Sequence, residues 1–395
     1  MAQPITQQHG AATRPVRTAF GATTTTIACV LPVFLVGGLA VQLAEDLHFS
    51  PAGLGLAVSI YFATSAVASL PAGYLVERLG PRMAAQIAIA LSGGSLLAAA
   101  LLARSYALLT LFLALSAGSN ALGQLASNAA LARQVPPGRQ GLSFGVKQAA
   151  IPLSTLLAGA AVPTIALTAG WRWAFVAAGT TALATLAAVP RSADGGTRAA
   201  RHSERRASAP LLTIGAAATL ASGAANGLGT FLVDSTVARG ISPGLAGLTL
   251  TLGSVICVAG RVFFGWLGDK RRSGHLATVA AMLLVGACGL TLLTKPNPAA
   301  LILGVALGFG FGWAWPGVMN FAVVQIYPQA PAAATSVTQT GVYAGGALGP
   351  LALGAIAEHA SYPTMWLTAA GAMLLAAALM VVGGQRLRAA AARHA

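Results

Sequence analysis

The chain has 395 residues, of which 56% are hydrophobic and only 8% are charged, and its mean hydropathy is +0.74. A soluble globular domain carries about 25% charged residues, so this composition excludes one. The formal net charge is +15, but the basic residues lie in short loops and tails and form no basic helix face that would suggest nucleic acid. The three cysteines fall inside apolar runs, which argues against a disulfide framework.

Twelve apolar runs are each long enough to cross a bilayer, whose hydrocarbon core is about 30 Å thick. Backbone groups in lipid must form their hydrogen bonds within the protein, so each run is predicted to be a helix. The sequence therefore predicts an all-α membrane protein with 12 transmembrane helices. The runs lie near 18–43, 54–76, 84–103, 106–132, 143–167, 172–189, 211–235, 245–268, 276–294, 300–326, 333–357 and 364–384.

Basic residues are distributed unequally between the two sides that these helices define. With the N-terminus inside, 17 of the 23 lysines and arginines fall in cytoplasmic segments and only four in the opposite loops. Positively charged loops favour the cytoplasmic side of a membrane. We therefore expect a multi-pass protein of the inner membrane with both termini in the cytoplasm.

One long polar segment, 190–210, separates the first six runs from the last six. It is basic and contains glycine, which is typical of a flexible cytoplasmic linker, and anionic lipid is an expected contact. The predicted organisation is a cytoplasmic tail over 1–17, a six-helix bundle over 18–189, the linker over 190–210, a second six-helix bundle over 211–384 and a cytoplasmic tail over 385–395.

A short motif at the end of the second run occurs again in the second half of the chain. The first copy, Gly73 to Arg82, reads GYLVERLGPR, and the second, Gly265 to Arg272, reads GWLGDKRR. The offset between the copies is 192 residues, close to half the chain length. Other pairs share this offset or miss it by one residue: Ser50 with Ser242, Pro51 with Pro243, Gly55 with Gly247, Asn128 with Asn320, Pro136 with Pro328, and Gln148 with Gln339. The pattern indicates a duplication of six helices.

Both copies resemble the loop signature of the major facilitator superfamily. The first copy has Glu77 in the acidic place and Pro81 where a basic residue is usual, and in the second copy the second glycine is missing or displaced to Gly274. The resemblance covers the whole chain and implies the fold of that superfamily, with two six-helix halves and a solute site between them. It also implies a gating role, in which a carboxylate at one helix end latches the halves together, for Gly73, Glu77, Arg78, Arg82, Gly265, Asp269 and Lys270.

Arg261 is the sharpest candidate for contact with the substrate. It lies eight residues before Asp269, hence about 12 Å along the helix and near the middle of the bilayer. A guanidinium at that depth needs a carboxylate on another helix or an anionic substrate. The spacing Arg-x-x-x-Gly from Arg261 to Gly265 is similar to helix 8 of the monocarboxylate and oxalate porters. That resemblance implies that the arginine contacts a substrate carboxylate.

Other polar residues inside the helices are candidates because polar groups in lipid are costly and tend to face a cavity or a partner. Fourfold spacing places Asn120, Gln124 and Asn128 on one stripe, and Ser222, Asn226, Thr230 and Asp234 on another. The alternative is that such residues join helices by hydrogen bonds and contact no solute. The predicted substrate-binding residues are Arg261, Asn120, Gln124, Asn128, Lys147, Gln148, Asn226, Thr230, Asn320 and Gln339.

Two charged residues have alternative interpretations. Lys147 lies only a few residues into the fifth helix, so its side chain could reach the cytoplasmic surface. With Gln148 beside it and the helix-bending Pro152 after it, Lys147 could instead line the inner mouth of the solute path. Asp234, near the outer end of the seventh helix, is a candidate for proton coupling or a solvated helix end.

These observations favour a secondary active transporter, not an enzyme, that moves a small organic anion by alternating access, with a proton as the coupling ion in a symport. No nucleotide loop or metal-ligand cluster is visible in the sequence, so no cofactor is predicted. The expected partners are a small-molecule substrate and membrane lipid, without nucleic acid, and the protein is expected to be monomeric. One alternative is a proton-coupled exporter of drugs or metabolites, although the Gly-Pro signature typical of exporters is absent from the fifth helix. An alternative of another class is a non-transporting membrane receptor on the same fold.

The charge distribution makes the topology testable by cysteine labelling in intact cells. In a cysteine-free background, Ser203→Cys in the predicted linker is expected to stay unlabelled by a membrane-impermeant thiol reagent, because the linker faces the cytoplasm. Lys295→Cys, in a predicted opposite loop, is expected to label strongly and serves as the control. Strong labelling at position 203 would reverse the orientation.

Overall fold

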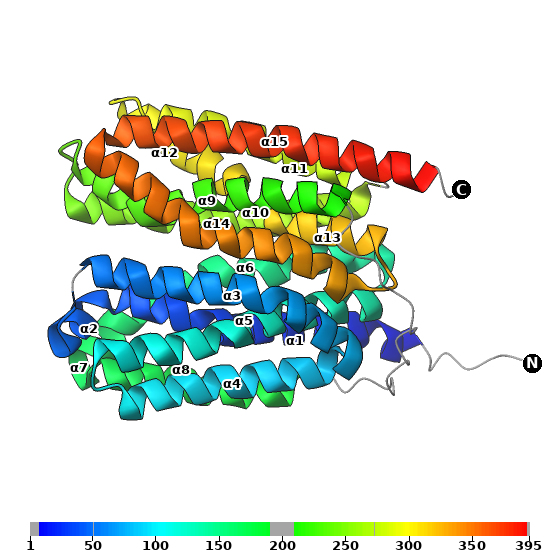
Figure 1. Cartoon of the computed structure of the whole chain (residues 1–395), viewed down its shortest axis with the longest axis horizontal. Helices are drawn as coiled ribbons and strands as arrows, with labels where there is room; N and C mark the ends of the chain where they lie inside the picture. Colours follow the sequence, from blue (N-terminus) through cyan, green and yellow to red (C-terminus); the bar gives the residue numbers. More distant parts are fainter. Residues whose placement is uncertain (1–7, 50, 190–208, 272, 393–395) are drawn as a thin grey trace, which may run out of the picture.

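The computed structural model describes residues 8–49, 51–189, 209–271 and 273–392, and these residues form helices joined by short loops, without a strand. Two layers of roughly parallel and antiparallel helices lie side by side in Figure 1, one formed by the first part of the chain and the other by the second. Helix α1 begins and helix α15 ends at the same end of the molecule, which we call the terminal face. The predicted linker lies largely outside the described residues, as do residues 1–7 and 393–395 of the predicted tails.

The N-terminal half contains six main helical segments and a short helix between the first two. Its elements are α1 (Gln8–Gly38), α2 (Ala40–Leu47), α3 (Pro51–Leu79), α4 (Pro81–Leu102), α5 (Tyr106–Gln134), α6 (Pro137–Ala161) with its continuation η2 (Val162–Ala166) and α7 (Leu167–Ala169), and α8 (Trp171–Ala184) with η3 (Thr185–Ala188). The short helix α2 was not predicted. It is held to α8 by hydrogen bonds of 2.7 and 3.0 Å from Arg172 and Trp171 to the carboxylate of Asp46, and these lower the pKa of Asp46.

The C-terminal half repeats the arrangement. Its elements are α9 (Ala209–Val237), α10 (Pro243–Lys270), α11 (His275–Leu292), α12 (Pro298–Leu307), η4 (Gly308–Gly312), α13 (Pro316–Ile326), α14 (Pro331–His359) and α15 (Tyr362–Ala392). The segment 300–326 was predicted as one transmembrane helix, and the structure has one candidate span over Pro298–Ile326 that is irregular in its middle. The helix widens to a π-turn over the glycine-rich η4 and is interrupted before Pro316, since proline has no N–H to continue the hydrogen-bond ladder.

Eleven of these segments meet the length and hydropathy expected of a membrane span, among the residues that the structure describes. The remaining predicted span corresponds to α8, which has 14 residues and continues in the 3₁₀-helix η3. The predicted all-α fold with two halves is therefore confirmed, while individual ends differ from the prediction by several residues.

The glycine that was missing from the second copy of the loop motif is supplied by Gly274. Gly80 precedes α4 with a φ of 82°, and Gly274 precedes α11 with the same φ of 82°. Positive φ is strained for residues with a Cβ atom, so glycine is required at both turns. The displaced glycine therefore has the same backbone role as its counterpart in the first copy.

The hydrophobic core shows where the halves meet. Toward the face opposite the terminal face, one large cluster contains only residues of the N-terminal half and another contains only residues of the C-terminal half. Two clusters nearer the terminal face combine both halves, for example Ala85 with Ala332, and Phe144 with Phe321. The halves are therefore packed together toward the terminal face.

The contacts that join the halves follow two seams, one between α3 and α14 and one between α6 and α10. On the first seam Phe62 stacks against Tyr343, and on the second Gly141 and Gly145 pack against Gly265. Among the described hydrogen bonds, ring contacts and close glycine approaches across these seams, none involves α3 before Phe62, α14 after Gly346, α6 after Gln148 or α10 before Arg261. This is a conformation closed at the terminal face.

The close approach of α6 to α10 predicts that Gly145→Ala is destabilising. An added Cβ would clash with the backbone carbonyl of Arg261, which has no flexible atoms to move aside. Overpacking of this kind typically costs about 1–3 kcal/mol, and we expect it as a lower thermal unfolding temperature of the purified protein.

Gly159→Ala, in the same helix, is the matched control because a Cβ there meets nothing within 4 Å. This substitution is expected to leave stability unchanged or to raise it by about 0.4–1 kcal/mol by restricting the unfolded chain. Equal effects of the two substitutions would show that the seam is not closely packed at Gly145.

Candidate functional site

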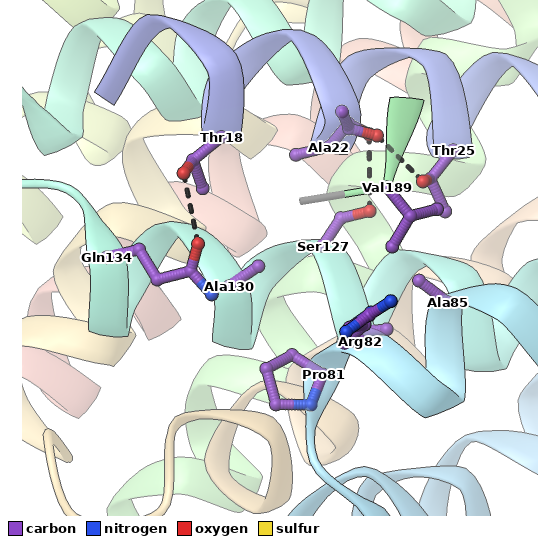
Figure 2. Close-up of a pocket in the computed structure, with 12 residues that line it drawn as sticks. Thr18, Ala22, Thr25, Pro81, Arg82, Ala85, Ser127, Ala130, Gln134 and Val189 are labelled. Carbon is purple, nitrogen blue, oxygen red and sulfur yellow. Dashed lines mark hydrogen bonds between the residues drawn. The ribbon is translucent and has the colours of Figure 1, made fainter. Parts of the chain in front are cut away.

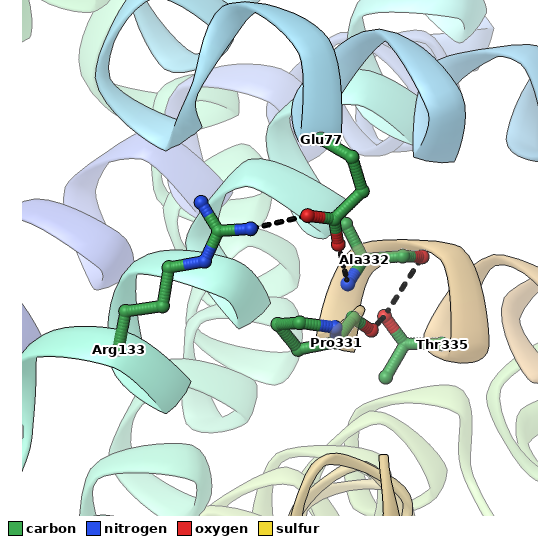
Figure 3. Close-up of polar contacts among 5 residues, drawn as sticks. All are labelled: Glu77, Arg133, Pro331, Ala332 and Thr335. Atoms are coloured by element: carbon green, nitrogen blue, oxygen red, sulfur yellow. Dashed lines mark hydrogen bonds and ion pairs between the residues drawn. The ribbon is translucent and has the colours of Figure 1, made fainter. Parts of the chain in front are cut away.

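The first copy of the loop motif joins the two halves through Glu77. Figure 3 shows its carboxylate between two groups: Oε1 accepts a hydrogen bond of 2.8 Å from the backbone N–H of Ala332, and Oε2 pairs with Arg133. Ala332 lies in the first turn of α14, where backbone N–H groups have no partner within the helix. Glu77, from the N-terminal half, therefore caps a helix of the C-terminal half.

The second copy makes the reciprocal contact. The carboxylate of Asp269, at the end of α10, accepts hydrogen bonds of 2.7 and 2.8 Å from the N–H groups of Gly141 and Leu142 near the start of α6. Negative charge is favourable near a helix N-terminus. Glu77 and Asp269 thus each accept hydrogen bonds from the backbone of the other half, one on each seam, and we call these two contacts the latches.

Not every predicted gating residue contributes to these latches. Gly73 packs against Ser336 and Gly265 against Gly141, so both glycines permit close helix approach. Lys270 lies over the ring of Trp266 at 5.7 Å, and Arg78 is exposed. Arg82 lies away from the latches and lines a pocket in the N-terminal half.

That pocket, which is partly open and has about 300 Å³ of space including open solvent, is lined by residues of α1, α4 and α5 and by Val189 (Figure 2). The hydroxyls of Thr18 and Ser127 line it and donate hydrogen bonds of 3.0 and 3.2 Å to Gln134 and to the carbonyl of Ala22. All its residues belong to one half and none is a predicted substrate ligand, so we do not assign it to the solute path.

Arg261 is buried at the α6–α10 seam, with 1% of its surface exposed. Its guanidinium donates two hydrogen bonds, of 3.0 and 3.3 Å, to the carbonyl of Trp313 in its own half, and one to the carbonyl of Gln148 in the other half. Sequence reasoning proposed a carboxylate or an anionic substrate as its partner. In the described part of the chain its partners are instead these backbone carbonyls and the thiol of Cys257, which solvate the charge but do not neutralise it.

Lys147 is completely buried, so the interpretation that its side chain reaches the surface is wrong. Its Nζ donates hydrogen bonds to Gln124 Oε1 and, at 3.0 Å, to Asn128 Oδ1, two members of the predicted α5 stripe. The structure therefore brings Lys147, Gln124, Asn128 and, through the adjacent Gln148, Arg261 into one region at the seam.

The other buried amides lie at corresponding places of the two halves. Asn128 on α5 and Asn320 on α13 are both fully buried, as are Gln148 on α6 and Gln339 on α14, which lies beside Tyr343. Asn120 and Asn320 have no protein partner for either side-chain polar atom among the described residues. Buried polar groups are usually hydrogen-bonded, so these amides have unused capacity for a bound solute or water.

The residues of the predicted stripe on α9 have different surroundings: some pack within the C-terminal half, and others are exposed. The hydroxyl of Ser222 donates a hydrogen bond of 2.8 Å to the carbonyl of Val342 on α14 within the same half. Asn226 donates to Ser222, and the exposed Thr230 donates to the carbonyl of Asn226. Asp234 is exposed at the end of α9 opposite the terminal face, close to Tyr362. The structure does not bring this stripe to Lys147 and Arg261 by any described contact.

A scan against protein-family models finds the Major Facilitator Superfamily, matching residues 22–233 and again 214–392. The chain belongs to the major facilitator superfamily. Members of this family are transporters of small molecules in membranes, not enzymes. The two overlapping matches agree with the two halves described above.

Solved structures of the superfamily share this fold. The proton:xylose symporter XylE bound to 6-bromo-6-deoxy-D-glucose superposes with a TM-score of 0.76 at 17% identity, covering 94% of this chain and 96% of that chain. The human organic anion transporter MFSD10 gives 0.72 at 18% identity, covering 96% and 100%. The E. coli fucose:proton symporter FucP gives 0.72 at 15% identity, covering 94% and 99%. Identities this low show the fold alone, and a search of curated protein sequences finds no match.

Three features of the site were missed by the sequence analysis. Arg133 pairs with Glu77, although it was counted only as a basic loop residue. Pro152 removes the N–H that would otherwise bond to the carbonyl of Gln148, four residues earlier, and so releases that carbonyl to Arg261. The carbonyl of Trp313 is available because the helix is interrupted between η4 and Pro316.

The latches predict a conformational effect of Asp269→Asn and Glu77→Gln. Hydrogen bonds to charged groups contribute about 1.5–3 kcal/mol, so removing the charge is expected to shift the balance away from the closed terminal face by about tenfold. The measurement is the labelling rate of Ser336→Cys in a cysteine-free background, because Ser336 is buried against Gly73 when the terminal face is closed. Transport is expected to slow while substrate affinity changes only a few-fold.

Asp46→Asn is the control, since it removes a carboxylate paired with Arg172 within one half. Labelling at position 336 is expected to be unaffected by it. Loss of substrate binding in Asp269→Asn without faster labelling would contradict the latch.

Proposed function

We propose that this transporter carries a small organic anion between its two halves by alternating access, with a proton as the coupling ion, in the inner membrane. The observation that supports the anion is the pair of buried cations at the α6–α10 seam, Lys147 and Arg261. The eight acidic residues of the sequence are Glu45, Asp46, Glu77, Asp194, Glu204, Asp234, Asp269 and Glu358. None of them occupies the middle of a membrane span.

Two positive groups without an acidic partner are unusual inside a membrane protein. Burying a charge away from water is costly unless it is paired, and amide and carbonyl dipoles compensate only part of that cost. An anionic solute bound between Lys147 and Arg261 would supply the missing charge. Charged residues inside a membrane mark substrate or ion pathways for this reason.

The similar structures are named for different substrates. XylE and FucP are named for sugars with protons, and MFSD10 for organic anions. A sugar is bound by neutral hydrogen-bonding groups. Because it carries no charge, it would not compensate the positive charge of Lys147 and Arg261. The charge of the site therefore favours the anion, and the two proton symporters support a proton as the coupling ion.

The proposed substrate ligands are Arg261 and Lys147 as the charged pair, with Gln124, Asn128, Gln148, Asn120, Asn320 and Gln339 as buried amides. Asn226 and Thr230 on α9 are proposed to line a part of the solute path away from Lys147 and Arg261. The proposed orientation places the terminal face and the linker 190–210 in the cytoplasm. The structure, closed at the terminal face, then corresponds to an outward-facing state, and opening of the Glu77 and Asp269 latches would expose the site to the cytoplasm.

The proposed function is tested by a thermal-stability screen of the purified protein. A ligand that binds the folded state raises its apparent stability. Pyruvate, benzoate, malonate and succinate are the anionic probes, compared with neutral sugars and with cationic amines. We expect stabilisation by at least one organic acid and by neither other class. Stabilisation by amines alone would favour the alternative function, a proton-coupled exporter of drugs or metabolites.

Arg261→Lys is expected to lose this response almost as fully as Arg261→Ala. An ammonium cannot reproduce the planar set of donors that reaches Gln148 and Trp313 together. Loss of one or more charge-assisted hydrogen bonds of about 1.5–3 kcal/mol corresponds to binding about ten- to a hundredfold weaker. The affinity for the stabilising acid is measured by titration of the unfolding temperature.

Arg239→Lys is the matched control. Arg239 also donates to backbone carbonyls, those of Leu293 and Lys295, but it lies beyond the end of α9 and away from the seam. It is expected to leave acid binding unchanged. A stable Arg261→Lys protein that binds the acid with near-normal affinity would end the assignment of Arg261 to the substrate.

A further inference from the structure

A proton-coupled transporter needs a group near its substrate that can gain and lose a proton during the cycle. Among the residues that the structure describes, no carboxylate fills that place. Glu77 and Asp269 cap helices at the terminal face, and Glu45, Asp46, Asp234 and Glu358 are exposed toward the opposite face. Asp194 and Glu204 belong to the predicted linker, outside the described residues.

Apart from His275, which lies near Asp269 toward the terminal face, the remaining ionisable groups near the seam in the described part of the chain are two cations, two thiols and two phenols. Arginine does not lose its proton in proteins, so Arg261 is a fixed charge. Thiols and phenols ordinarily ionise at about pH 8.5–10, and ionisation of Cys29, Cys257, Tyr61 or Tyr343 would bury a new anion. Lysine is different, because it exchanges a proton readily when it is buried.

The contacts of Lys147 suit both of its protonation states. Nζ has two acceptors on the protein, the side-chain oxygens of Gln124 and Asn128. A neutral amine has two N–H groups and can satisfy both. An ammonium has three, so protonation adds one donor beyond those that the protein uses.

The surroundings of Lys147 contain no competing base. The helices that pack against α6 include α1, α5, α10 and α13. Their ionisable groups that act on Lys147 are Arg261 on α10 and Cys29 on α1, while α5 faces it with the neutral Gln124 and Asn128. The described part of α13 carries no ionisable side chain.

We propose that Lys147 is the proton-carrying residue of this transporter: its Nζ takes up one proton together with one organic anion and releases both at the other face. This inference rests on the proposed function. The proton binds the lone pair of the neutral amine, the third N–H then donates to the anion, and both steps reverse on release. Arg261 stays positive throughout, so the empty site and the site loaded with one proton and one monovalent anion carry the same charge.

The equality of charge leads to a specific test in proteoliposomes. The probe is whichever of pyruvate and benzoate stabilises the wild type, with uptake driven either by a pH gradient at clamped voltage or by a voltage at equal pH. Wild type is expected to accumulate the acid with the pH gradient and to ignore the voltage. Lys147→Arg, with a permanent charge, is expected to keep exchange of internal for external acid but to lose accumulation driven by the pH gradient.

Two further variants test whether a carboxylate carries the proton instead: one removes the other candidate carrier, and the second is its control. Asp234→Asn tests the other candidate carrier, and Glu358→Gln removes an exposed carboxylate near the end of α14. We expect both to retain accumulation driven by the pH gradient. Loss of that accumulation in Asp234→Asn together with its retention in Lys147→Arg would overturn the proposal and assign the proton to Asp234.

A second measurement does not depend on the folding of Lys147→Arg. Addition of the acid, adjusted to the same pH, to the weakly buffered wild-type protein is expected to make the solution more alkaline as protons are taken up, and Lys147→Gln should show no such change. An absent pH change in wild type, or an equal change in Lys147→Gln, would reject Lys147 as the carrier. Wild type that exchanges none of the four acids would reject the proposed function itself, and this inference with it.

Discussion

The arrangement of the site depends on how a buried guanidinium is solvated without a carboxylate. Arg261 finds its acceptors where the helical hydrogen-bond ladder is broken: Pro152 releases the carbonyl of Gln148, and the interruption before Pro316 leaves that of Trp313. Because Gln148 and Trp313 belong to different halves, Arg261 also joins the halves at mid-depth. Because the acceptors are neutral, its positive charge stays available for an anion.

The two seams have equivalent helix-end contacts but different chemistry. Each has one carboxylate that caps a helix of the other half, Glu77 on the α3–α14 seam and Asp269 on the α6–α10 seam. The repeat places Ser69 and Thr338 where the second seam has Arg261 and Lys147, and both hydroxyls donate to carbonyls of their own helices. The α3–α14 seam therefore has no buried cation and carries the stacked Phe62 and Tyr343. An anion would be held on one side of the path while the other side acts as a neutral sliding surface.

Sequence reasoning reached the fold because bilayer thickness and backbone hydrogen bonding set the length of each apolar run, and because the repeated motif defined two halves. It also selected Arg261 and the α5 stripe, since depth and fourfold spacing follow from helix geometry. It could not find Arg133 as the partner of Glu77, or the carbonyl partners of Arg261, because these depend on which helices and helix breaks lie together in the folded chain. Lys147 shows the limit best: its position near the start of a helix allowed a surface location, and only the packing of α6 among its neighbouring helices buries it.

The contacts of Arg261 also suggest why a bound anion would promote the transition between states. In the closed terminal face its guanidinium is bonded to Gln148 across the seam, so separating the halves there breaks this bond along with the helix caps. An anion that accepts the same N–H groups would replace Gln148 and remove one tie between the halves. A ligand shifts a conformational equilibrium only by its difference in affinity between the states. In the proposed transport cycle, competition between the anion and Gln148 for one guanidinium would provide such a difference, because the empty protein would retain a contact that the loaded protein exchanges for its substrate.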